Sequence, residues 1–199
     1  MKTRAALLFA GLVFAVPVAA QVVTTTDPAV LEAGDYTMDP GHARILFGYK
    51  HQGFSTSYGF FALPTAKLHF EPKDLAKSTL EVDVDLNNID TTVPKLDAHL
   101  KSEDFFDVAK FPTAVFKATK VVATSATAGT VTGDLTLHGV TKPVTLNVTF
   151  SGGATVRGGY TLGFDATTVI KRSDFGVKTY VPMVGDDVTL TISAEFHKG

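Results

Sequence analysis

The sequence of 199 residues predicts an all-β fold, in which one antiparallel sheet curls into a barrel and a single short helix interrupts the strands. Apolar residues recur at every second position over most of the chain, and Gly, Pro, Asn and Asp cluster between these runs. A sheet with one apolar face must bury it, either against a second sheet or by closing on itself. At about eight strands, a closed barrel is either filled by side chains or holds one ligand, and periodicity does not separate the two.

The first twenty residues are expected to form a secretory signal peptide. Lys2 and Arg4 precede the apolar run 5–16, and small residues lead to Ala20, after which we expect cleavage. The apolar run is shorter than the ~20 residues that span a bilayer, so we expect no stable membrane anchor. These features predict a periplasmic or secreted protein of Gram-negative type, with residues 21–199 forming one domain.

Strands with one apolar and one polar face follow the Thr-rich segment 21–26. The clearest is 80–86, where Leu80, Val82 and Val84 alternate with acidic residues. The other predicted strands are 44–50, 54–70, 114–122, 130–138, 144–150, 157–168 and 188–196.

One stretch has helical spacing instead. In 93–102, Leu96 and Leu100 lie four residues apart and follow Pro94, a residue favoured in the first turn of a helix. A weaker helical turn is predicted at 72–76.

Composition excludes several classes of function. The chain contains no cysteine, so disulfides and thiol nucleophiles are absent. Without the leader, 16 basic residues stand against 20 acidic ones, a formal charge of −4, which argues against nucleic acid as a partner.

Neither metal binding nor catalysis has a sequence signature here. The six histidines are dispersed without metal-ligand spacing, and we expect most to be structural or on the surface: His42, His51, His69, His99, His138 and His197. The chain has no Gly-x-Ser-x-Gly nucleophile motif, and the acidic residues of 102–107 suit helix capping or a turn better than acid–base catalysis. We therefore expect no catalytic residue, no metal and no cofactor.

Four motifs resemble those of the YceI-like family of polyisoprenoid-binding periplasmic proteins. The first comprises Tyr36, Asp39, Pro40 and His42, followed by Phe47, His51, Gly53, Ser55, Gly59 and Phe61. The second runs from His99 to Asp107 and continues with Phe111, Pro112, Thr113 and Phe116. The third and fourth are 133–144 and 170–176.

The resemblance implies an extended antiparallel barrel of lipocalin-like shape that encloses a long apolar pocket for an isoprenoid quinone or a polyprenyl compound. We expect the pocket wall to include Phe47, Phe61, Phe105, Phe106, Leu137, Ile170 and Phe175. The expected polar contacts are His51, His99, Arg172 and Asp174. Each of these residues is also compatible with a core position or an ordinary ion pair, and Arg172 and Asp174, two apart on a strand, would then pair with each other.

The expected function is therefore to carry or store a long isoprenoid lipid, not to catalyse a reaction. Two alternatives stay open: an enzyme acting on a hydrophobic isoprenoid-type substrate, and a filled structural barrel that binds a protein partner. A homodimer is compatible with the sequence.

Overall fold

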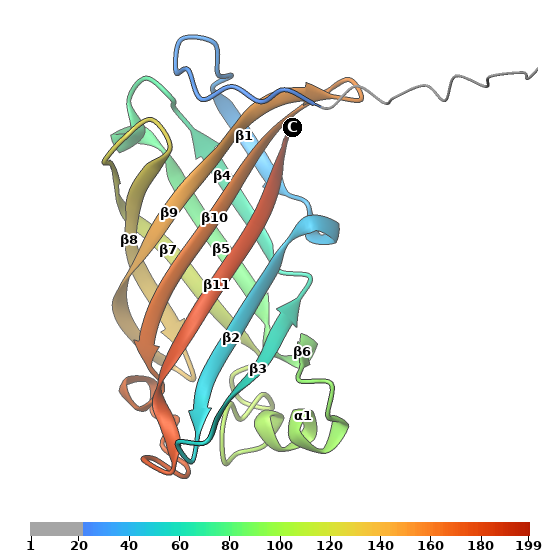
Figure 1. The fold of residues 1–199 in the computed structure, drawn as a ribbon, viewed down its shortest axis with the longest axis vertical. Coiled ribbons are helices and arrows are strands. Elements are labelled where there is room, and N and C mark those ends of the chain that lie inside the picture. The colour runs from blue at the N-terminus through green and yellow to red at the C-terminus, as the bar shows by residue number, and fades with distance from the viewer. Residues whose placement is uncertain (1–21) are drawn as a thin grey trace, which may run out of the picture.

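Eleven β-strands form one antiparallel sheet in the computed structural model, which describes residues 22–199 (Figure 1). The strands are β1 Gly34–Met38, β2 Arg44–His51, β3 Ser55–Ala62, β4 Thr65–Phe70, β5 Thr79–Asp85, β6 Ile89–Asp90, β7 Thr113–Ala123, β8 Ala128–Leu137, β9 Val140–Val156, β10 Gly159–Lys171 and β11 Val184–Lys198. The helix is α1 Pro94–Lys101, and the 3-10 turns are η1 Pro40–His42, η2 Leu75–Lys77, η3 Leu86–Asn88 and η4 Arg172–Phe175. The expected signal peptide, residues 1–20, lies outside the described residues.

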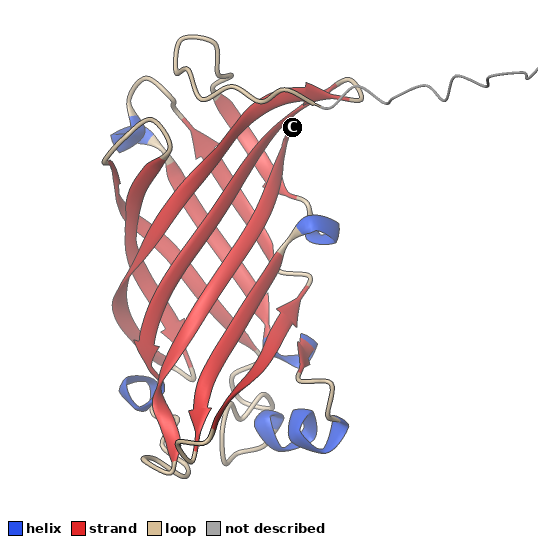
Figure 2. Ribbon diagram, in the orientation of Figure 1, coloured by secondary structure: helices blue, strands red, loops and turns tan. Residues whose placement is uncertain are grey.

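The sheet closes on itself because its first and last strands pair. The order is β1-β4-β5-β7-β8-β9-β10-β11, and β1 returns to β11 with Met38 opposite Phe196. The predicted eight-stranded antiparallel barrel is therefore confirmed, and Figure 2 shows its strands tilted around a long axis.

At three of the eight strand positions around this barrel, two consecutive strands take the place of one continuous strand. At the first position, β1 and β2 both pair with β11. At the next, β4 pairs with β1 and β3 pairs with β2. At the third, β5 pairs with β4 and β6 pairs with β3. The breaks fall at η1, at Leu63–Pro64 and at η3.

The break at Leu63–Pro64 corrects the prediction of one strand over 54–70. Leu63 has a φ of 53°, which extended backbone does not allow, and Pro64 has no N–H to donate to a neighbouring strand. The prediction also missed β1, a five-residue strand, and placed the helical turn at 72–76 slightly before η2. The helix over 93–102 is confirmed as α1.

Two buried apolar clusters support the barrel wall at its two ends. One packs Leu86, Leu100 and Phe175 near α1, and the other packs Tyr36, Leu162 and Phe196 near the closing strands. Within residues 22–199, no helix has both the length and the apolar character needed to cross a membrane.

Candidate ligand-binding cavity

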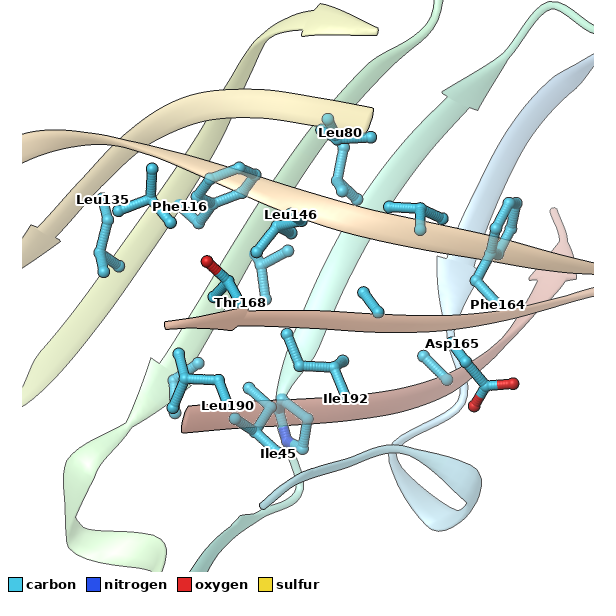
Figure 3. A pocket seen from close by; sticks show the side chains of 18 of the residues that line it. Ile45, Leu80, Phe116, Leu135, Leu146, Phe164, Asp165, Thr168, Leu190 and Ile192 are labelled. Carbon is cyan, nitrogen blue, oxygen red and sulfur yellow. The ribbon is translucent and has the colours of Figure 1, made fainter. Parts of the chain in front are cut away.

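The interior of the barrel is hollow. A cavity of about 700 Å³ lies between the strands, within the range of roughly 300 to 1,000 Å³ common for small-molecule sites. Figure 3 shows part of its wall, to which β2 contributes Ile45, β9 contributes Leu146, and β11 contributes Leu190 and Ile192.

Strand periodicity makes this wall apolar. On β10, Phe164, Ala166, Thr168 and Ile170 line the cavity and alternate with exposed residues, because successive side chains of a strand point to opposite faces. The exposed residue Asp165 is a further lining residue of this strand. Thr168, a hydroxyl in the wall, donates a hydrogen bond from Oγ1 to the carbonyl oxygen of Thr145 at 2.9 Å, so its polar atom is satisfied by the barrel itself.

The cavity extends between the two ends of the barrel. Its lining includes Leu31, Leu75 and Ala126 from the segments opposite α1, and His99 and Tyr180 from the α1 end. Figure 1 shows that α1, the end of β2 and the segment after β10 share this second end. The space is therefore elongated along the barrel axis.

Six of the seven predicted wall residues line this cavity: Phe47, Phe61, Phe105, Phe106, Leu137 and Ile170. The ring of Phe61 lies 5.4 Å from that of Phe47 and 5.9 Å from that of Phe106, measured between centroids. Aromatic pairs at such distances attract one another, so three residues from distant parts of the chain form one apolar surface.

Phe175 lies behind the wall instead. Its side chain is 2% exposed, packs in the core cluster near α1 and does not line the cavity. It ends the short turn η4, whose geometry turns the side chain away from the direction that a continuing strand would give it.

Comparison with known proteins identifies the family. The YceI-like domain matches residues 36–196. The chain belongs to the YceI-like family. A UPF0312 protein of Pseudomonas aeruginosa (strain LESB58) is 39% identical over 166 residues, which span 82% of this chain and 86% of the relative.

Two solved structures share this YceI-like barrel. Burkholderia cenocepacia BcnA superposes with a TM-score of 0.73 at 25% identity, covering 79% of this chain and 98% of BcnA. A polyisoprenoid binding domain from Saccharophagus degradans has a TM-score of 0.61 at 15% identity, covering 84% of this chain and all of that domain. At 15% identity, the second comparison supports the fold alone.

Two predicted polar residues of this YceI-like barrel, His51 and His99, line the α1 end of the cavity. His99 Nε2 lies 3.3 Å from Asp104 Oδ2, and its ring meets the ring of Phe105 edge-on at 5.0 Å. His51 is exposed at the last position of β2. Imidazoles at one end of a mostly apolar cavity provide polar partners where a ligand's polar group would emerge.

Arg172 also lines the cavity, but its guanidinium already donates hydrogen bonds to backbone carbonyl groups. Nε donates to Gly185 O at 2.9 Å, Nη1 donates to Val177 O at 3.0 Å and Thr179 O at 2.9 Å, and Nη2 donates to Val184 O at 2.8 Å. Burial lowers the pKa of Arg172, and the carboxylate of Asp186 partly offsets this effect. The side chain ties the loop 177–185 to the barrel end.

Asp174 lies on the outside of η4, exposed and apart from the cavity lining. The acidic residue that interacts with the turn is Asp186, which accepts hydrogen bonds from Ser173 N at 2.9 Å and Ser173 Oγ at 2.7 Å. The expected placement of Arg172 and Asp174 two apart on a strand is therefore wrong, because both lie in η4, and the two side chains do not form the pair that a strand would allow.

Sequence reasoning missed several wall residues, among them Tyr49, Thr168 and Tyr180. Tyr49 and Thr168 have a signal in the sequence, because each lies two residues along its strand from another inward residue. Tyr180 has none: it lies in an irregular loop, where its ring approaches that of His99 at 6.2 Å.

Proposed function

We propose that this protein binds one long isoprenoid lipid, such as an isoprenoid quinone or a polyprenyl compound, and carries or stores it in the periplasm. The observation that carries this proposal is the cavity of about 700 Å³, whose wall is mostly apolar from the η2 end to the α1 end. The lipid would be the cargo, and the proposal requires no other cofactor.

Burial of the tail supplies enough free energy for stable binding. At ~0.8 kcal/mol per buried CH₂, a tail with about twenty buried carbons would gain on the order of 16 kcal/mol before losses. Ordering the tail and desolvating the headgroup reduce this gain by several kcal/mol. A wall without specific polar contacts is therefore sufficient to hold the ligand.

The distribution of polar side chains orients the proposed ligand. His51 and His99 lie at the α1 end, whereas the lining of the opposite end contains Leu31 and Leu75 with the hydroxyls of Thr26, Ser78 and Ser125 and, among the described residues, no histidine. A headgroup would contact the imidazoles, and the tail would extend toward η2. The same arrangement favours binding over catalysis, because Arg172, a cation that also lines the cavity, is held by four hydrogen bonds to the backbone.

The hollow interior favours a ligand carrier over a filled structural barrel with a protein partner. The fold that this chain shares with a polyisoprenoid binding domain is therefore one that can bind a ligand of this class. The enzyme alternative predicts turnover of the bound lipid that depends on His51 or His99, and the carrier predicts none.

Solvent extraction of the purified protein, followed by mass spectrometry, tests the proposal. The expected result is close to one isoprenoid molecule per protein chain, recovered chemically unchanged after prolonged incubation. A protein that is free of lipid and takes up no added isoprenoid quinone would overturn it. If the wild-type protein chemically converts the lipid and His99→Gln does not, the enzyme alternative would replace the carrier proposal.

A further inference from the structure

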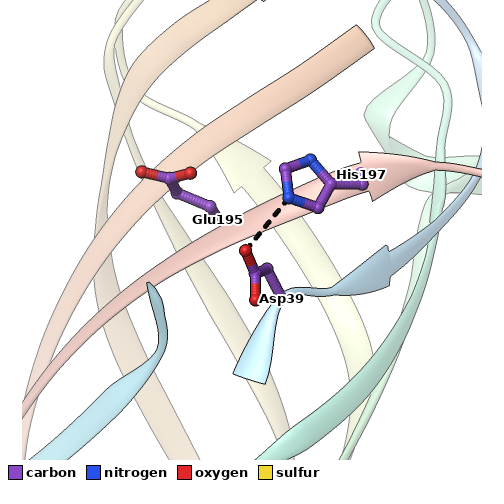
Figure 4. A group of neighbouring side chains, drawn as sticks. All are labelled: Asp39, Glu195 and His197. Atoms are coloured by element: carbon purple, nitrogen blue, oxygen red, sulfur yellow. Dashed lines mark hydrogen bonds and ion pairs between the residues drawn. The ribbon is translucent and has the colours of Figure 1, made fainter. Parts of the chain in front are cut away.

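Four side chains that can ligate metal gather on the outside of the barrel, where its first and last strands meet. Asp39 precedes η1, His42 is the last residue of η1, and Glu195 and His197 lie on β11. Figure 4 shows Asp39, Glu195 and His197. We call these four residues the seam cluster. Their sequence spacing gave no sign of a metal site, because Asp39 and His197 are 158 residues apart and meet only when the barrel closes.

The distances in the seam cluster are those of a ligand set. One ligand atom each from Asp39, Glu195 and His197 lies within 4.8 Å of the other two. His197 Nε2 is 3.1 Å from Asp39 Oδ2, close to the separation of about 3.3 Å between two ligands of a tetrahedral Zn²⁺ with bonds of about 2.0 Å. His42 Nδ1 lies 2.7 Å from the same oxygen, so a further donor atom lies next to Asp39.

The backbone fixes the position of Asp39. Its N–H donates to the carbonyl oxygen of Glu195 at 2.9 Å, which joins the two carboxylate residues across the seam. Its Oδ1 accepts a hydrogen bond from Gly41 N at 2.8 Å as the cap of η1, so Oδ2 is the oxygen that faces the histidines.

The ring of His197 is oriented through its other nitrogen. Nδ1 lies 3.0 Å from Thr161 Oγ1, and Thr161 is directly opposite His197 in the pairing of β10 with β11. Histidines that bind metal usually engage their second ring nitrogen in such a hydrogen bond, which directs the first nitrogen toward the ion. This contact therefore holds Nε2 toward Asp39.

The charges of the cluster suit a divalent cation. Asp39 and Glu195 contribute two negative charges, and Arg44, a nearby cation, donates instead to the carbonyl oxygens of Pro40 at 3.1 Å and Ala43 at 2.6 Å. Mixed imidazole and carboxylate ligands are typical of sites for Zn²⁺ and related transition metals.

We propose that the seam cluster binds one divalent transition-metal ion of the Zn²⁺ class, with Asp39, Glu195 and His197 as ligands and His42 as the fourth donor. The ion would connect the end of β1 to β11 and thereby stabilise the closure of the barrel. This proposal is independent of what the cavity holds.

Titration calorimetry with Zn²⁺ on chelator-treated protein, freed of any affinity tag, tests the proposal. We expect one saturable site in the wild type, none in His197→Gln, and binding about tenfold weaker in Thr161→Val, which loses only the orienting hydrogen bond. Asp39→Asn keeps the cap to Gly41 but loses the charge, and it is also expected to weaken binding.

The matched control is His69→Gln, because His69 also lies beside two carboxylates, Asp35 at 2.7 Å and Glu71 at 3.3 Å, but away from the cluster. We expect it to bind Zn²⁺ as the wild type does. Saturating Zn²⁺ should raise the melting temperature of the wild type and of His69→Gln, but not that of His197→Gln. Equal binding by the wild type and a folded His197→Gln, or non-saturating binding to all variants, would overturn the proposal.

Discussion

Nη2 of Arg172 donates a hydrogen bond to the carbonyl oxygen of Val184 at 2.8 Å, and so joins the turn after β10 to the first residue of β11. With three further hydrogen bonds to the backbone, this one side chain fixes the loop that lies over the α1 end of the cavity. The fourth YceI-like motif, 170–176, thus contains a residue that shapes the end of the cavity through the backbone.

Replacing Arg172 by Met should destabilise the fold substantially. The change leaves four carbonyl groups without their charged donor, at a cost on the order of 3 kcal/mol. Thermal unfolding should show a decrease of roughly 6 to 12 °C in melting temperature. Lys171→Met is the control, because the pair of Lys171 with Asp187 is exposed and should contribute below ~1 kcal/mol. Equal melting temperatures for the two variants would contradict the assigned role of Arg172.

Gly59 is predicted to be required for the position of Phe47. A Cβ at residue 59 would lie 2.4 Å from Phe47 Cζ and 3.0 Å from the carbonyl oxygen of Asp90. Gly59→Ala should therefore displace the ring into the cavity and cost about 1 to 3 kcal/mol in the free energy of unfolding. Denaturant titration measures this cost, and Gly159→Ala, where the nearest atom is 3.9 Å away, serves as the control. A loss as large in the control would remove the steric explanation.

The surface pair of His69 and Asp35 should make stability depend on pH. The hydrogen bond from the imidazole to Asp35 raises the pKa of His69 above its ordinary value of 6.5. A raised pKa stabilises the fold at a pH below 6.5, and this contribution is lost as the pH rises through the folded-state value. His69→Gln should therefore lower the melting temperature more at acidic than at alkaline pH. An NMR titration of the imidazole that gives a pKa at or below 6.5 would refute the assignment.

The regular part of the barrel was predictable from the sequence, because strand periodicity depends on neighbouring residues. Alternation along 80–86 and 188–196 predicted which side chains face inward, and Leu96 and Leu100 predicted α1. The break at Leu63–Pro64 was not predicted, since aromatic and β-branched residues continue on both sides of it.

Predictions for the site were limited by contacts between distant segments. Phe47, Phe61 and Phe106 line the cavity as expected. These residues were predictable because each lies within a YceI-like motif. The partners of Arg172 are backbone carbonyl groups in the loop 177–185, and no sequence pattern encodes such contacts. The seam cluster was missed for the same reason, since it depends on the pairing of β1 with β11.

Titration of the lipid-free protein with an isoprenoid quinone tests most directly whether the hollow interior is the binding site. Ala166 lines the cavity, whereas its neighbour Thr167 is exposed on the same strand, so Ala166→Phe places a ring in the cavity and Thr167→Phe places one outside. We predict one molecule bound per chain in the wild type and in Thr167→Phe, and at least tenfold weaker binding in a folded Ala166→Phe. Undiminished binding by Ala166→Phe would contradict the account.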